Sequence, residues 1–185
     1  DDSGKLNFDM GVCSWFKWDD VSEQAVREFK QQAGLNSDAP SKELITNLGL
    51  LTDKGEITNA VPMLFSEACG KRFISAIIHC VRFKGTDNVH IIDSKQFGGP
   101  ILSQYNNATA WIKQYLAVEY VMHDFDPRQE IWELPLDAIK EALTNALCHR
   151  DYFENGAKIM VELYDDRLEI SNPGGLLSYV AEDFG

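Results

Sequence analysis

The chain has 185 residues, of which 44% are hydrophobic and 25% are charged. This composition excludes a disordered tail, a collagen-like fibre and a disulfide-stapled mini-protein, and it suffices for one ordinary domain or two small ones. The formal net charge of -12 argues against a nucleic-acid clamp, because an acidic surface repels phosphate backbones. No apolar run in the sequence approaches the ~20 residues that span a bilayer. The first ten residues also lack a secretory signal, so we expect a cytoplasmic protein without a membrane partner.

Four cysteines are scattered along the chain, at Cys13, Cys69, Cys80 and Cys148. They form no CxxC pair and have no histidine beside them at metal-ligand spacing. The pattern predicts reduced, mostly buried thiols, as in a cytosolic protein.

The N-terminal third predicts a helix over residues 19–33, with Asp19 or Asp20 as its cap and Gly34 as its end. Its apolar stripe repeats at helical spacing. That stripe consists of Val21, Ala25, Val26 and Phe29.

A second short helix is expected over residues 41–48, capped by Ser41. Residues 53–55 (Asp-Lys-Gly) lie between apolar residues and predict a hairpin turn. Two helices and a small hairpin are the outline of a winged helix, which we assign to residues 1–68. Wings often contact DNA, although winged helices also serve as spacers or dimer contacts, and the acidic balance of this segment favours the spacer.

The middle of the chain, residues 69–134, predicts an α/β region. In chain order we expect a short helix at 60–68, strands at 72–83 and 89–93, a helix at 101–118, and strands at 118–125 and 130–134 joined at Asp126-Pro127. This is the least acidic part of the chain, and it predicts a weak basic band as one candidate DNA contact. A solvated strand edge is the simpler interpretation. The band comprises Lys71, Arg72, Arg82, Lys84, Lys95 and Lys113.

The last segment, residues 135–185, carries the most specific pattern. A helix is expected over 136–152, followed by an antiparallel hairpin at 157–164 and 168–171 and a glycine-rich turn at 172–175. The apolar stripe of the helix is formed by Leu136, Ile139, Leu143 and Leu147.

Three polar side chains stack one helical turn apart on the other side of this helix: Glu141, Asn145 and His149. The small residues Ala142 and Ala146 beside them leave room for a ligand to approach. Polar residues at this spacing also occur on helix faces that are exposed to solvent and bind no ligand. A solvent-exposed face without a binding role therefore remains the alternative.

The stretch EALTNALCHRDY (141–152), followed by DRLEISNPGGL (166–176), resembles the C-terminal region of bacterial proteins described as RecG-related ATP-dependent DNA helicases or transcriptional regulators. The segments LGLLTDKGEITNA and CVRFKGTD are also similar to that group, so the resemblance covers about residues 20–185. In such proteins a Schlafen/AlbA-type DNA-binding domain usually precedes this region. We therefore expect this chain to be part of a longer protein that contacts DNA through that domain.

The resemblance extends to the ATPase fold of histidine kinases, gyrase and Hsp90, the GHKL group, whose helix carries E-x-x-x-N. It implies a catalytic role for Glu141 in orienting the attacking water, and a Mg²⁺-ligand role for Asn145. It also implies ATP and Mg²⁺ as cofactors, with His149 near the nucleotide.

The next GHKL motif is D-x-G-x-G, and here the chain reads Ser-Asn-Pro-Gly-Gly at 171–175. Asn172 is the nearest polar substitute for the adenine-reading Asp, and Gly174 and Gly175 allow close backbone approach. The missing Asp implies a nucleotide site with at most weak ATPase activity. The chain also has no GxxxxGK[ST] loop, so we expect no motor helicase activity.

The sequence therefore predicts an α+β protein with a winged-helix-like N-terminal segment and an incomplete GHKL-like helix-on-sheet layer at its C-terminus. Its predicted function is an ATP-binding regulatory region of a transcriptional regulator. The alternative is a non-catalytic dimerisation or scaffold module, in which the winged-helix-like segment and the exposed hairpin strands build a homo-oligomer, namely a homodimer, and the polar face of the helix is plain surface.

Overall fold

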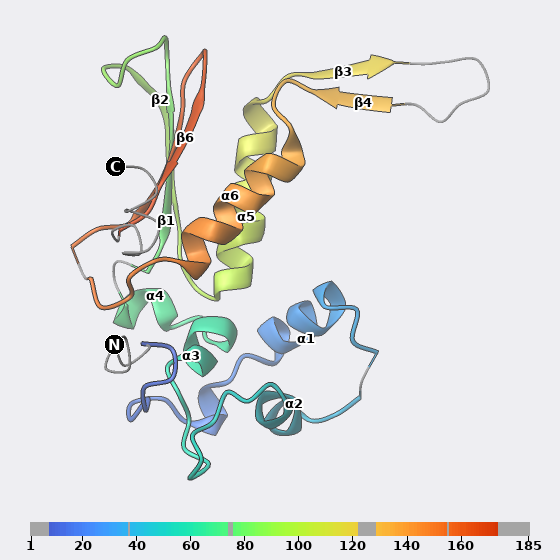
Figure 1. The fold of residues 1–185 in the computed structure, drawn as a ribbon, viewed down its shortest axis with the longest axis vertical. Helices are drawn as coiled ribbons and strands as arrows, with labels where there is room; N and C mark the ends of the chain where they lie inside the picture. The colour runs from blue at the N-terminus through green and yellow to red at the C-terminus, as the bar shows by residue number, and fades with distance from the viewer. Residues whose placement is uncertain (1–7, 37, 74–75, 122–128, 155, 174–185) are drawn as a thin grey trace, which may run out of the picture. The chain divides into compact units, whose positions relative to one another are not determined.

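The computed structural model describes residues 8–36, 38–73, 76–121, 129–154 and 156–173 and confirms the α+β class (Figure 1). The chain divides into two compact units, Asp1–Ile77 with Gly98–Gln104, and Ile78–Phe97 with Tyr105–Gly185. The expected three-part division at residues 1–68, 69–134 and 135–185 stays a prediction. Each unit is described below by itself.

The first unit is built from short helices. They are the 3-10 helix η1 (Trp18–Asp20) and the α-helices α1 (Glu23–Gln32), α2 (Ser41–Asn47), α3 (Ala60–Phe65) and α4 (Cys69–Arg72). Their apolar side chains enclose one core. It comprises Cys13, Phe16, Ala25, Val26, Leu44, Ile45, Ile57, Val61 and Phe65.

Helix α1 begins later than the sequence predicts. The expected caps Asp19 and Asp20 lie in η1, and Ser22 caps α1 instead, since its Oγ accepts a hydrogen bond from Ala25 N–H at 3.2 Å. The hydroxyl of Ser22 thus satisfies one of the free amides of the first turn. Gly34 follows the helix with φ 66°, which confirms its expected role at the C-terminus.

Helix α2 begins at Ser41, but its N-cap is Pro40. The expected capping role of Ser41 is wrong because its Oγ donates to the Glu23 carboxylate at 2.8 Å. This bond links the first turns of α1 and α2.

The predicted turn at 53–55 is confirmed. Leu51 and Ile57 form an antiparallel bridge, and Gly55 closes the turn with φ 76°. Thr52 N–H donates to Glu56 O at 2.9 Å across it. The turn requires a positive φ, which glycine adopts without strain.

The second unit contains a four-stranded mixed sheet in the order β2-β1-β5-β6. The strands are β1 (Ile78–Phe83), β2 (Ile91–Phe97), β5 (Ile159–Leu163) and β6 (Leu168–Ser171). Strand β1 runs antiparallel to β2 and parallel to β5, with Ile78 opposite Ile159, and β5 runs antiparallel to β6. The predicted hairpin of β5 and β6 is confirmed.

The strand expected at 72–83 begins only at Ile78. Residues 69–72 form α4 instead, and the Arg72 guanidinium lies 5.6 Å from the centre of the Trp15 ring. Phe73 also contacts Trp15, edge to face at 5.8 Å. These aromatic and cation–π contacts hold the first part of the run in the first unit.

Two longer helices accompany the sheet: α5 (Ile101–Tyr115) and α6 (Leu136–Cys148). Figure 1 shows α6 and the part of α5 that belongs to the second unit on one side of the sheet. Helix α5 ends three residues before the expected position 118. A separate antiparallel pair, β3 (Val118–Val121) and β4 (Gln129–Trp132), matches the predicted strands, while Asp126-Pro127 lies outside the described residues.

Within the described residues, no helix has both the length and the apolar character that crossing a bilayer requires.

Candidate functional site

Helix α6 presents the two faces that the sequence predicts. Ile139, Leu143 and Leu147 are buried, and they hold the helix in the core of the second unit. The opposite positions Glu141 and Asn145 are exposed to solvent. The carboxylate and the amide thus lie one turn apart on an accessible helix surface.

The helix ends at Cys148, four residues before the predicted end at Tyr152. His149 is the exposed C-cap, and its N–H donates to Asn145 O at 2.9 Å. The chain then turns back, since Tyr152 Oη donates to Leu147 O at 2.9 Å. This side-chain bond uses a carbonyl of the last helical turn, which has no partner within the helix.

The turn after α6 is joined to the end of β6. Asp151 N–H donates to Pro173 O at 3.1 Å, and helix α6 packs against β6. Asn172, which is half-buried, therefore lies in the segment that reaches the C-terminal end of α6. His149 and Asn172 are brought to one region by this bond, while Gly174 and Gly175 lie outside the described residues.

Arg150 is buried in the same turn, at 5% exposure. Its Nη2 donates to Ala157 O at 2.8 Å, and its guanidinium lies 5.3 Å from the centre of the Tyr152 ring. Within the described residues, Nε and Nη1 have no hydrogen-bond partner. Desolvation lowers the pKa of Arg150 from its usual value, although Tyr152, Asp151 and Glu154 favour the charged form. The sequence pattern did not single out this residue.

The side-chain oxygens of Glu141 and Asn145 on α6 suit a hard cation better than a soft one. An Asn oxygen and a Glu carboxylate are oxygen ligands of the kind that Mg²⁺ takes, and Mg²⁺ usually keeps several waters or phosphate oxygens besides. Among the described residues, no three His, Cys, Asp or Glu side chains form a cluster that could hold a metal by themselves. A cation at Asn145 would therefore need ligands from a bound phosphate.

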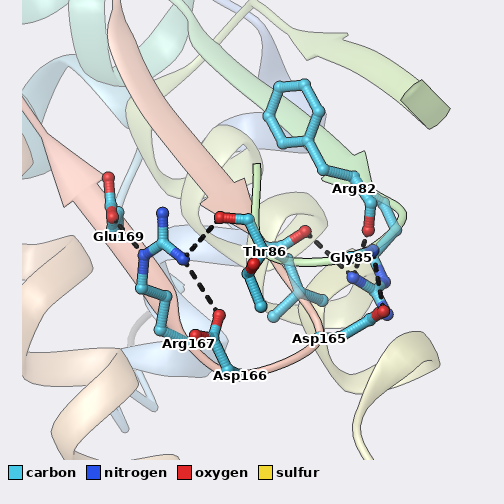
Figure 2. A network of polar contacts seen from close by, with 9 residues as sticks. Arg82, Gly85, Thr86, Asp165, Asp166, Arg167 and Glu169 are labelled. Carbon is cyan, nitrogen blue, oxygen red and sulfur yellow. Dashed lines mark hydrogen bonds and ion pairs between the residues drawn. The ribbon is translucent and has the colours of Figure 1, made fainter. Parts of the chain in front are cut away.

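A second polar cluster lies at the far end of the β5–β6 hairpin (Figure 2). Arg82 of β1 donates to Asp165 Oδ1 at 2.5 Å and to Leu163 O at 3.2 Å. Gly85 N–H donates to the other oxygen of Asp165 at 2.7 Å. The Arg82 and Gly85 hydrogen bonds hold the pKa of Asp165 below its usual range.

Arg167 completes this cluster. It donates to Glu169 at 2.5 Å, to Asp166 at 2.9 Å and to Thr86 O at 3.0 Å, and its guanidinium stacks 3.9 Å from the Tyr164 ring centre. A pocket of about 60 Å³ lies beside it, lined among others by Arg82, Tyr115, Asp165 and Arg167. The two arginines are already engaged by carboxylates and carbonyls, which gives the cluster a structural character.

The sequence indicated residues 165–167 only as a turn and Arg82 only as part of a basic band. Three members of that band have partners in the structure. Arg82 binds Asp165, Arg72 lies over Trp15, and Lys113 Nζ lies 5.0 Å from the Trp132 ring centre. The ion pair offsets the charge of Arg82, whereas Arg72 and Lys113 keep their positive charge beside the aromatic rings.

Comparisons with known proteins give likenesses both in sequence and in structure. A family model described as "Putative ATP-dependent DNA helicase recG C-terminal" matches residues 156–184, directly after the turn that follows α6. No curated protein matches the chain.

Among solved structures, the DIP2311 protein from Corynebacterium diphtheriae is similar, with a TM-score of 0.75 and 18% identity. The likeness covers 94% of this chain and 34% of that one, so the chain spans about a third of that protein's length. At this identity the likeness shows the fold alone.

Proposed function

We propose that this chain is the ATP-binding regulatory region of a bacterial transcriptional regulator of the RecG-related kind. The observation that carries the proposal is the exposed pair Glu141 and Asn145 on α6, whose C-terminal turn is tied to Pro173. The match of residues 156–184 to a RecG-related C-terminal family supports the same assignment.

In this proposal, α6 and the β5–β6 hairpin form a divergent GHKL-like layer. Helix α6 packs against β6, and the antiparallel hairpin β5–β6 follows it in the chain. In the first unit, α1, α2 and the bridge of Leu51 with Ile57 support a winged-helix-like segment.

The residues of α6 have distinct roles in this proposal. Asn145 would hold Mg²⁺ through its side-chain oxygen, and His149 would lie near the phosphates at the end of the helix. When bound, Mg²⁺ neutralises the charge of the phosphates. Glu141 would hold a water by hydrogen bonding, one helical turn from Asn145.

Adenine recognition rests on Asn172 with Gly174 and Gly175. A neutral Asn accepts a hydrogen bond from the adenine amine more weakly than a carboxylate does. We therefore propose nucleotide binding with at most weak hydrolysis. Strand separation is not part of the proposal, because the sequence lacks a GxxxxGK[ST] loop.

We further propose that, in the whole protein, DNA binding belongs to a domain other than this region. Nucleotide binding by the chain would then regulate a DNA-bound regulator in the cytoplasm. The net charge of -12 supports the assignment of DNA binding to another domain, since it disfavours direct DNA contact by this region.

Calorimetric titration of the chain with ATP in the presence of Mg²⁺ tests the proposal. Asn145→Ala should weaken binding at least about tenfold, because a hydrogen bond or ligand contact to a charged group contributes about 1.5–3 kcal/mol. Thr144→Ala is the matched control, since Thr144 is exposed on the same helix and its Oγ1 donates to Lys140 O at 2.8 Å. Absence of heat with ATP, or equal affinity of the two variants, contradicts the proposal.

The second candidate is a non-catalytic dimerisation module. It is favoured by the exposed apolar residues Ile91 and Ile92 of β2, at 61% and 55% exposure. Light scattering after size-exclusion chromatography distinguishes it, because this module predicts a concentration-dependent mass and no effect of ATP.

A further inference from the structure

Strand β2 is an edge of the four-stranded sheet in the described part of the chain. Its backbone is paired with β1 on one side only. Edge strands of this length usually carry a proline, a covering segment or repelling charges that prevent pairing with other chains. Here the strand contains no proline, and its first two residues, Ile91 and Ile92, are exposed. Its pairing with β1 shifts register at Ile92, so the regular part of this edge is 93–97.

The charges of β2 are arranged symmetrically about Ser94. Asp93 precedes it and Lys95 follows it. If two copies of β2 pair antiparallel with Ser94 at the two-fold axis, Asp93 of each copy lies directly opposite Lys95 of the other. Directly opposite side chains in such a pair are about 4.5–5.5 Å apart at Cβ, which allows two ion pairs.

The Asp93 carboxylate is held in place for such a contact. Its Oδ2 accepts hydrogen bonds from Trp111 Nε1 at 2.8 Å and from Tyr115 Oη at 2.7 Å, and its Oδ1 accepts one from Ser94 N–H at 2.9 Å. Helix α5 thus fixes a negative charge on the edge strand, while Lys95 beside it is exposed. A strand of unrelated sequence would leave Asp93, Lys95 or both opposite a residue without the complementary charge. A second copy of this chain supplies a complementary charge to each of them.

We propose that β2 is a homodimerisation edge, at which two copies of this chain extend their sheets antiparallel about Ser94. The exposed Ile91 and Ile92 flank this regular segment. The surface of one strand is small, so the dimer is weak and depends on protein concentration. This inference does not depend on ATP binding.

Cysteine cross-linking tests the interface and its register. In a Cys148→Ser background, Ser94→Cys should form a disulfide-linked dimer rapidly on oxidation, since a central pair lies within disulfide reach. Val89→Cys is the collision control, because Val89 is 67% exposed and lies outside β2. Equal cross-linking at the two positions, or none at Ser94→Cys, overturns the proposal.

Sedimentation analysis of Lys95→Glu provides an independent measurement. This change places Glu opposite Asp93 twice, and it should raise the dissociation constant of the dimer at least tenfold. Val89→Ser should leave that constant unchanged. A wild-type chain that stays monomeric up to about millimolar concentration, or an unaltered Lys95→Glu dimer, overturns the proposal.

Discussion

Arg82 of β1 and Asp165 of the β5–β6 turn form an ion pair at 2.5 Å across 83 positions of the sequence. The Asp165 carboxylate also accepts a hydrogen bond from Gly85 N–H, and Asp165 N–H donates a hydrogen bond to Gly85 O at 3.0 Å. This relationship joins the turn after β1 to the turn after β5, and it closes the end of the sheet.

Asp165→Asn should therefore lower the urea midpoint of unfolding. The change leaves Arg82, whose side chain is only 16% exposed, without its anionic partner. Asp166→Asn is the control and should shift the midpoint less, because Arg167 keeps Glu169 as a partner. Equal shifts in the two variants would contradict this assignment.

The decrease in the urea midpoint of unfolding caused by Asp165→Asn should also depend on pH. The pKa of Asp165 is lower in the folded chain than in the unfolded one, where a carboxyl has a pKa near about 3.9. The unfolded state then binds more protons as pH falls, so the stabilisation is present above that value and is lost below it. Wild type and Asp165→Asn should converge in urea midpoint toward pH 3.

Tyr115→Phe should destabilise the second unit by about 1 kcal/mol, the usual net contribution of one hydrogen bond. The lost bond is the one from Tyr115 Oη to Asp93, at 2.7 Å. The bonds from Tyr115 and Trp111 hold the pKa of Asp93 below its usual range, so the difference between variant and wild type should shrink as pH falls through that lowered pKa.

Chemical denaturation at pH 7 and pH 3 measures this effect. Tyr105→Phe serves as the comparison, since Tyr105 is a half-buried tyrosine on the same helix. A pH-independent loss in Tyr115→Phe would show that the hydroxyl stabilises something other than the Asp93 carboxylate.

The four thiols should react at very different rates. Cys148 is exposed, whereas Cys13, Cys69 and Cys80 are buried. Burial raises the pKa of both Cys69 and Cys80 to about 12, so few thiolates form there at pH 8. A colorimetric disulfide reagent should titrate one fast thiol in the folded chain and four in guanidinium chloride.

Cys148→Ser should abolish that fast phase and leave the slow one intact. A fast phase that persists in this variant would mean that a thiol assigned to the core is accessible.

Arg150→Lys should destabilise the chain by about 2 kcal/mol, although the charge is kept. The ammonium of Lys lacks the planar fork that binds Ala157 O while lying over the Tyr152 ring, and burying it is costly. The matched control is Arg27→Lys, at an exposed position of α1, which should change the free energy of unfolding by less than about 0.5 kcal/mol. Similar losses at the two sites would contradict the role of Arg150.

Local patterns predicted the elements whose signals lie close together in sequence. The turn at 53–55, the hairpin of β5 and β6 and the two faces of α6 all follow from neighbouring residues. The end of α6 did not, because Tyr152 Oη returns to Leu147 O, and nothing in the helical pattern encodes that bond. The roles of Glu141, Asn145, His149 and Asn172 stay predictions, since exposure and proximity alone do not establish them.

Contacts between distant segments were beyond the reach of the sequence. The pairing of Ile78 with Ile159, and the bonds that Trp111 and Tyr115 make to Asp93, join residues whose types occur throughout the chain. The sequence pattern predicted a strand in this run, but it carried no information on which strand lies beside it. The strand boundary at Ile78 was missed for the same reason, because Arg72 and Phe73 pack on the distant Trp15.

The parallel pairing of β1 with β5 also sets the order of events during synthesis. Ribosomes make the chain from its N-terminus, and β1 must wait until residue 163 has emerged before its inner neighbour exists. Closing so long a loop is slow, so the nascent chain holds β1 without its inner neighbour while residues 84–163 are made. Chaperone capture of stalled chains should accordingly fall sharply once β5 clears the exit tunnel.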